Sequence, residues 1–177
     1  MKKNKNTFRL MLLILMTIYL NNYKIFAKPH NEFIRIDETK SLESFLKEAF
    51  EADSLENYNK ESELLNITIK EYPKSDSAYA RRSRVKLILK DTVGAFADVE
   101  RAIKINPKSN YAYYRRGVLN EELKKYKEAI EDYNKSIELN PNYVDAYYNM
   151  GLSKIELKDY RGAIADYLNL LEWKILV

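Results

Sequence analysis

The chain has 177 residues, 46% of them hydrophobic and 32% charged, which is typical of one folded domain and not of a disordered chain or a membrane bundle. It contains no cysteine, which excludes a disulfide framework, a thiolate metal site and a cysteine nucleophile. Five basic residues lie before residue 28. The remainder holds 25 Lys and Arg against 26 Asp and Glu, and this nearly neutral body has no nucleic-acid footprint.

The N-terminus has the order of a secretory signal peptide. Residues 1–9 carry four basic residues and no acidic one, and the apolar run LMLLILMTIYL follows at residues 10–20. That run is shorter than the roughly 20 residues that a membrane-spanning helix needs. We therefore predict that residues 1–27 are a signal peptide cleaved after Ala27, with an uncleaved N-terminal membrane anchor as the alternative. Either interpretation places the rest of the protein outside the cytoplasm, in the periplasm or the extracellular space.

Residues 28–41 show no clear period and are expected to form a tether, which contains the single histidine, His30. From residue 42 onward the chain repeats itself. The stretch 110–143, NYAYYRRGVLNEELKKYKEAIEDYNKSIELNPNY, is echoed at 76–109 and at 144–177. A degenerate copy is expected at 42–75, and Pro73, Pro107 and Pro141 follow one another at a single fixed interval.

This pattern resembles the tetratricopeptide repeat, a helix-turn-helix unit of about 34 residues. The resemblance covers residues 42–177 and implies an all-α solenoid of stacked helical hairpins wound into a right-handed superhelix. A single hairpin cannot bury its apolar face, so neighbouring repeats have to stack.

Positions counted within each repeat unit predict how the helices pack. Position 8 is small in every unit, and position 20 is alanine in the three regular units, so the two helices of a hairpin are expected to meet there. Position 4 carries a large anchor on the first helix, and position 24 carries a residue expected to pack onto the next repeat. The residues at position 8 are Ala49, Ser83, Gly117 and Gly151, and those at position 20 are Ala95, Ala129 and Ala163. The residues at position 4 are Phe45, Tyr79, Tyr113 and Tyr147, and those at position 24 are Leu65, Val99, Tyr133 and Tyr167.

Three features depart from the family pattern. Position 7, usually leucine, is Arg82 and Arg116, and position 11, usually tyrosine, is Lys or Asn. We interpret these as long stems lying along apolar surface with their charge in water, in preference to a built polar site. In the degenerate copy, Glu61 occupies position 20, where the three regular units have alanine. The third feature is the apolar C-terminal tail, residues 173–177, which no polar capping helix follows.

No catalytic constellation, cofactor motif or metal-ligand spacing occurs in the sequence, and an enzyme is not predicted. The adjacent carboxylates Glu121 and Glu122 are interpreted as solvated helix surface.

The family resemblance implies that the first helices line a concave groove. Arginine and tyrosine are enriched where binding energy concentrates, and arginine forks onto carboxylates. The alternative is an ordinary solvated face. The family's carboxylate clamp for chaperone C-termini is rejected, since only Arg115 matches it. The candidate groove residues are Arg81, Arg84, Tyr111, Tyr114, Arg115, Tyr148 and Asn149.

We therefore predict a non-catalytic protein–protein interaction scaffold or adaptor of the cell envelope, whose groove binds a protein or peptide segment of acidic character. No nucleic-acid partner is expected, and membrane contact is expected only through an uncleaved N-terminal segment. The alternative is a structural subunit that self-associates through the apolar tail.

Overall fold

The computed structural model describes residues 23–27, 33–37 and 41–175, which belong to two units, residues 1–44 and 45–177. In the first unit, β1 (Tyr23–Ala27) pairs antiparallel with β2 (Phe33–Asp37), in a register that runs from Tyr23 opposite Asp37 to Ala27 opposite Phe33. The segment expected to be an irregular tether thus contains a strand. The tether and the cleavage site stay predictions, and residues 1–22, the core of the expected signal peptide, lie outside the described residues.

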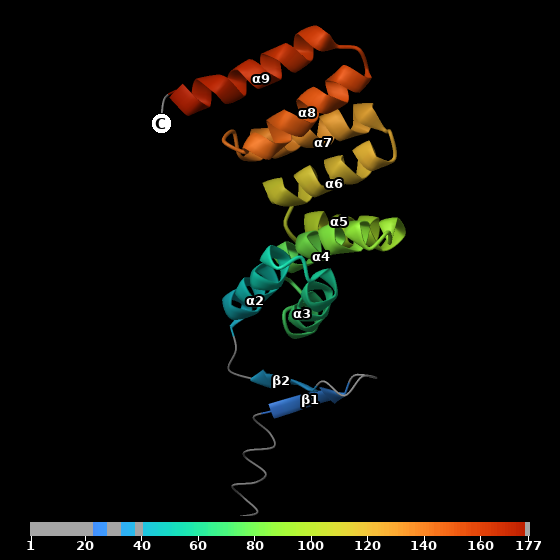
Figure 1. The fold of residues 1–177 in the computed structure, drawn as a ribbon, viewed down its shortest axis with the longest axis vertical. Coiled ribbons are helices and arrows are strands. Elements are labelled where there is room, and N and C mark those ends of the chain that lie inside the picture. The colour runs from blue at the N-terminus through green and yellow to red at the C-terminus, as the bar shows by residue number, and fades with distance from the viewer. Residues whose placement is uncertain (1–22, 28–32, 38–40, 176–177) are drawn as a thin grey trace, which may run out of the picture. The chain divides into compact units, whose positions relative to one another are not determined.

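The remainder of the described chain is helical, which confirms the predicted all-α solenoid. Four hairpins follow one another, each within one repeat unit, and their first helices are equal in length (Figure 1). Among the described residues, none of the helices combines the length and apolarity that crossing a bilayer requires. The helices are α2 (Leu42–Ser54), α3 (Tyr58–Glu71), α4 (Asp76–Ile88), α5 (Thr92–Ile105), α6 (Asn110–Glu122), α7 (Tyr126–Leu139), α8 (Val144–Glu156) and α9 (Tyr160–Ile175).

The turn inside each hairpin has one recurring geometry. A residue with positive φ follows every first helix, at the same place in each unit, and these residues are Glu56, Lys90, Lys124 and Lys158. Asn57, Asp91 and Asp159 then cap the following helices by accepting a backbone N–H. Among the first helices, α4 is capped by Ser75, which accepts the N–H of Ala78, whereas the side chain of Ser109 before α6 makes no such bond.

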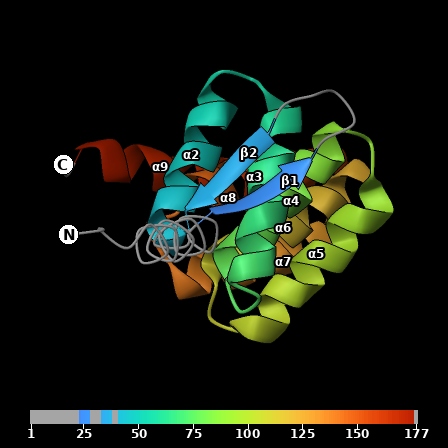
Figure 2. The ribbon, with the colours of Figure 1, turned by 90° about the horizontal axis from the view of Figure 1, so that it is seen from below.

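The apolar core is shared between hairpins. Three buried clusters each combine residues of one hairpin with residues of the next first helix, for example Leu65 of α3 with Val85 of α4. The first helices α4, α6 and α8 also contact one another in succession. Seen from below, these helices lie one behind another (Figure 2). Each hairpin therefore depends on its neighbour for burial, as a solenoid requires.

The predicted close approach within hairpins is confirmed at Gly117, but the nearest side chain is Tyr133 at position 24 and not Ala129 at position 20. A Cβ added there would lie 2.5 Å from Cε1 of Tyr133, whose side chain is fully buried, and Gly151 faces Tyr167 in the same way. Small and large residues are thus matched at positions 8 and 24. The pair is Ala49 with Leu65 in the first unit, Ser83 with Val99 in the second, and glycine with tyrosine in the last two.

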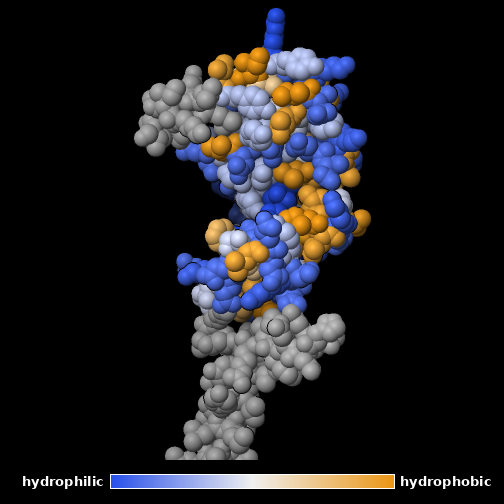
Figure 3. Space-filling model, viewed as in Figure 1, coloured by the Kyte–Doolittle hydropathy of each residue, from blue (hydrophilic) through white to orange (hydrophobic). Residues whose placement is uncertain are grey.

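The end of the stack at α9 is less covered than the inner hairpins. Ile164 is 59% exposed, whereas the residues at the same position of α5 and α7, Phe96 and Ile130, are partly buried against core clusters. Leu168, one turn further along α9, is 52% exposed, and hydrophobic surface lies over this helix (Figure 3). The helix continues through the predicted tail as far as Ile175.

A size-swap tests the matched pairs. Gly117→Leu should lower the free energy of unfolding by roughly 1–3 kcal/mol through overpacking against Tyr133. Gly117→Ala should be tolerated better in a Tyr133→Leu background, which copies the pair Ala49 and Leu65, than in the wild-type background. Urea unfolding of the wild type, Gly117→Ala, Tyr133→Leu and the double variant measures the coupling between the two positions. Equal effects of Gly117→Ala in both backgrounds would show that the register is misassigned.

Candidate partner-binding groove

The arginines at position 7 are held in ion pairs. Arg82 donates from Nε and Nη2 to the carboxylate of Asp98, at 2.7 and 2.6 Å, and from Nη1 to Asn66. Arg116 likewise donates from Nε and Nη2 to Asp132, and from Nη1 to Glu100 of the preceding unit. The interpretation that these charges reach into water is therefore wrong, because both guanidinium groups are tied to acids on second helices.

The residues at position 11 contact the same aspartates. Lys86 lies 2.9 Å from Asp98, and Asn120 donates to Asp132 at 2.9 Å. Lys154 lies 2.7 Å from Asp166, whose pKa is raised by burial although the lysine opposes that shift. Asp98, Asp132 and Asp166 are buried and occupy the same position of successive units, which is the sequence signal that would have revealed this polar layer.

Arg84, a predicted groove residue, is also engaged in the fold. Its Nη2 donates to Glu61 at 2.8 Å and pairs with Asp53 as well. Glu61 is fully buried, and burial raises the pKa of its carboxyl group while the pairing with Arg84 opposes that shift. The glutamate that interrupts the small-residue pattern is thus compensated by an arginine of the next hairpin.

Arg81 and Arg115 differ from Arg82, Arg84 and Arg116. Within the described part of the chain neither has a hydrogen bond or an ion pair, and each lies over a ring, Phe50 at 5.8 Å and Tyr114 at 5.9 Å. Arg115 is 6% exposed, and its buried Nε has no acceptor among the described residues. Burying a guanidinium without an acceptor is unfavourable, so this group is suited to receive an anion.

The ring of Tyr114, over which Arg115 lies, belongs to an aromatic cluster. The Tyr114 ring stacks on Tyr111 at 6.3 Å and meets Tyr143 edge-on at 5.1 Å. Asn149 of α8 donates to the hydroxyl of Tyr114 at 3.2 Å, which links two successive first helices. Burial raises the pKa of Tyr114, so this hydroxyl stays protonated. The predicted residues Tyr111, Tyr114, Arg115 and Asn149 are therefore brought together.

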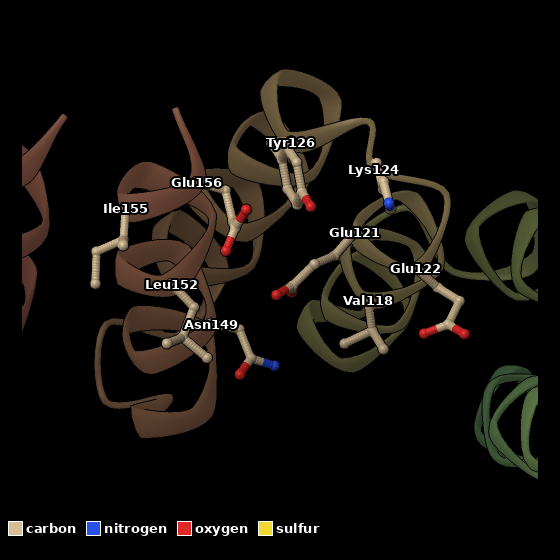
Figure 4. A pocket seen from close by; sticks show the side chains of 9 residues that line it. All are labelled: Val118, Glu121, Glu122, Lys124, Tyr126, Asn149, Leu152, Ile155 and Glu156. Carbon is tan, nitrogen blue, oxygen red and sulfur yellow. The ribbon is translucent and has the colours of Figure 1, made fainter. Parts of the chain in front are cut away.

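A pocket of about 650 Å³ lies between α6 and α8. Glu121, interpreted from sequence as solvated surface, is half-buried there and accepts a hydrogen bond from the hydroxyl of Tyr133 at 2.6 Å. Burial raises the pKa of Glu121, and the neighbouring carboxylates of Glu156 and Glu122 add to this shift. Figure 4 shows the lining residues, which are Val118, Glu121, Glu122, Lys124, Tyr126, Asn149, Leu152, Ile155 and Glu156. No group of acids and histidines in the described residues is placed to hold a metal ion.

Comparison with known proteins agrees with this architecture. Two tetratricopeptide repeat models match, at residues 111–143 and 132–165, so the chain contains tetratricopeptide repeats. No curated protein matches the chain.

Several solved structures share the fold. A crystal structure of MamA is 24% identical over 76% of this chain and 79% of its own, with a TM-score of 0.64. The TPR domain of Arabidopsis OM64 is 27% identical over 64% and 93%, with a TM-score of 0.58. The first TPR of Spaghetti (RPAP3), solved bound to the HSP90 peptide SRMEEVD, is 23% identical over 70% and 97%, with a TM-score of 0.61.

The polar layer can be tested by removing one aspartate. Asp132→Ala leaves Arg116 and Asn120 without their shared acceptor, and should lower the free energy of unfolding by about 2 kcal/mol, since Arg116 is partly solvated and fully buried pairs cost more. The control Glu131→Ala changes an exposed acid on the same helix and should stay within about 0.5 kcal/mol. Equal stability of the two variants in chemical denaturation would contradict a stabilising polar layer.

Proposed function

We propose that this protein is a non-catalytic scaffold or adaptor of the cell envelope, which binds an acidic segment of a partner protein in the groove lined by α4, α6 and α8. Tetratricopeptide repeats are protein–protein interaction scaffolds, which supports the general role. The acidic character of the partner is supported by one observation, the buried guanidinium of Arg115 that lacks an acceptor among the described residues.

The proposed site has a charged and an aromatic part. Arg81 and Arg115 occupy the same position of successive units, and each is free to fork onto a carboxylate. Tyr148, 53% exposed on α8, offers a ring to the apolar side chains of the segment. Arg84 has a structural role and is not assigned to the partner, because its guanidinium already pairs with Glu61 and Asp53.

The location outside the cytoplasm is proposed from the basic and apolar start of the sequence. Mass spectrometry of the protein from its native host should find a new N-terminus at or near Lys28. Ala27→Phe, which removes the small residue at the cut, should leave the longer precursor. A mature protein in the cytoplasm that begins at Met1 would contradict export.

The groove can be tested with a defined probe, the tetrapeptide acetyl-Asp-Leu-Leu-norleucine-amide, titrated into the full chain and followed by NMR. Arg81→Ala with Arg115→Ala should weaken binding about tenfold, since hydrogen bonds to charged groups are strong. The exposed Arg101 of α5 provides the control, Arg101→Ala. Arg115→Lys, which keeps the charge and loses the fork, separates recognition from misfolding. Binding should also fall with salt.

Unchanged binding in the double variant would contradict the groove proposal.

The alternative, a structural subunit that assembles through its C-terminal end, is favoured by the exposure of Ile164 and Leu168 on α9. Sedimentation of the full chain and of a variant lacking residues 173–177 tests this alternative. Concentration-dependent association that the deletion abolishes would assign the function to this end, and a monomer in both cases would exclude it.

A further inference from the structure

The pocket between α6 and α8 has an acidic rim and an apolar wall. Glu121 of α6 and Glu156 of α8 extend toward one another across the gap (Figure 4). Val118 and Leu152 line the same cavity below them. The cavity of about 650 Å³ is large enough for a long side chain that carries its charge at the tip.

The two carboxylates lack a counter-charge. Neither Glu121 nor Glu156 forms an ion pair within the described residues, although Lys124 also lines the cavity. Their mutual repulsion contributes to the raised pKa of Glu121, after burial. A cation placed between them would relieve this repulsion, and its apolar stem would cover Val118 and Leu152.

Arg115 supplies an independent sign that the groove is incomplete without a ligand. Arg115 is 6% exposed, its buried Nε has no acceptor in the described part of the chain, and it lies on the same helix as Glu121. The step from Arg115 to Glu121 corresponds to about 9 Å along the axis of α6. The groove therefore changes from basic to acidic over a short distance.

We propose that the Glu121–Glu156 pocket binds a lysine or arginine side chain of the same segment whose carboxylate binds Arg115. This inference rests on the proposed function and specifies the partner further, as a segment of mixed charge. An extended chain advances about 3.3 Å per residue, so the acid and the base are about three residues apart. The two charges also fix the direction in which the segment lies in the groove.

A double-mutant cycle tests the pocket. The full chain is titrated with acetyl-Asp-Leu-Leu-Lys-amide and with the norleucine tetrapeptide, which differs only in the ammonium group. The lysine peptide should bind about two- to fivefold more tightly, which is the range of an accessible ion pair. Glu156→Gln should remove that difference. Glu138→Gln, a substitution of an exposed glutamate on α7, is the charge-matched control and should preserve it.

The outcomes separate the pocket from the groove. Equal binding of both peptides to the wild type would overturn the pocket and leave the acid site at Arg115 standing. Failure of both peptides to bind would overturn both. Loss of the lysine preference with magnesium chloride, but not with sodium chloride of equal ionic strength, would assign the pocket to a divalent cation and overturn the proposal.

Discussion

The close contact of Gly117 with the ring of Tyr133 sets how tightly its hairpin closes, and the rest of the array depends on contacts of this kind. Because the two helices meet at a small residue, the first helix presents its remaining faces to the neighbouring hairpin and to the groove. Matched residues recur at the same two positions of every unit, so each hairpin closes around a pair of similar combined bulk. Stacking then buries what a single hairpin leaves exposed.

Neighbouring arginines on one helix have different roles. Arg116 points to Asp132 and Glu100 and joins hairpins together, whereas Arg115 turns to the aromatic side of the groove and has no acceptor in the described residues. One residue along a helix is about 100° around its axis, which is enough to separate the two faces. The polar layer thus joins the hairpins, whereas Arg115 stays outside that layer.

The repeat period predicted the family, the hairpins and the close approach at Gly117, because these depend on spacing alone. The roles of the charges were harder to predict, because they depend on which acid lies opposite. Arg81 and Arg84 look equivalent in sequence, yet only Arg84 faces Glu61, a residue that seemed merely to break the pattern. Asp132 accepts from both Arg116 and Asn120, so the role of either residue depends on an acid that lies more than ten residues away in the sequence.

The central claim is that Arg115 receives a ligand while Arg116 belongs to the scaffold. The most direct measurement follows the Nε–H signals of both arginines in ¹⁵N-labelled protein during titration with acetyl-Asp-Leu-Leu-Lys-amide. The account predicts that the Arg115 signal shifts in a saturable manner and that the Arg116 signal, held by Asp132, stays in place. A shift at Arg116 with none at Arg115, or saturation with neither signal moving, would contradict the account.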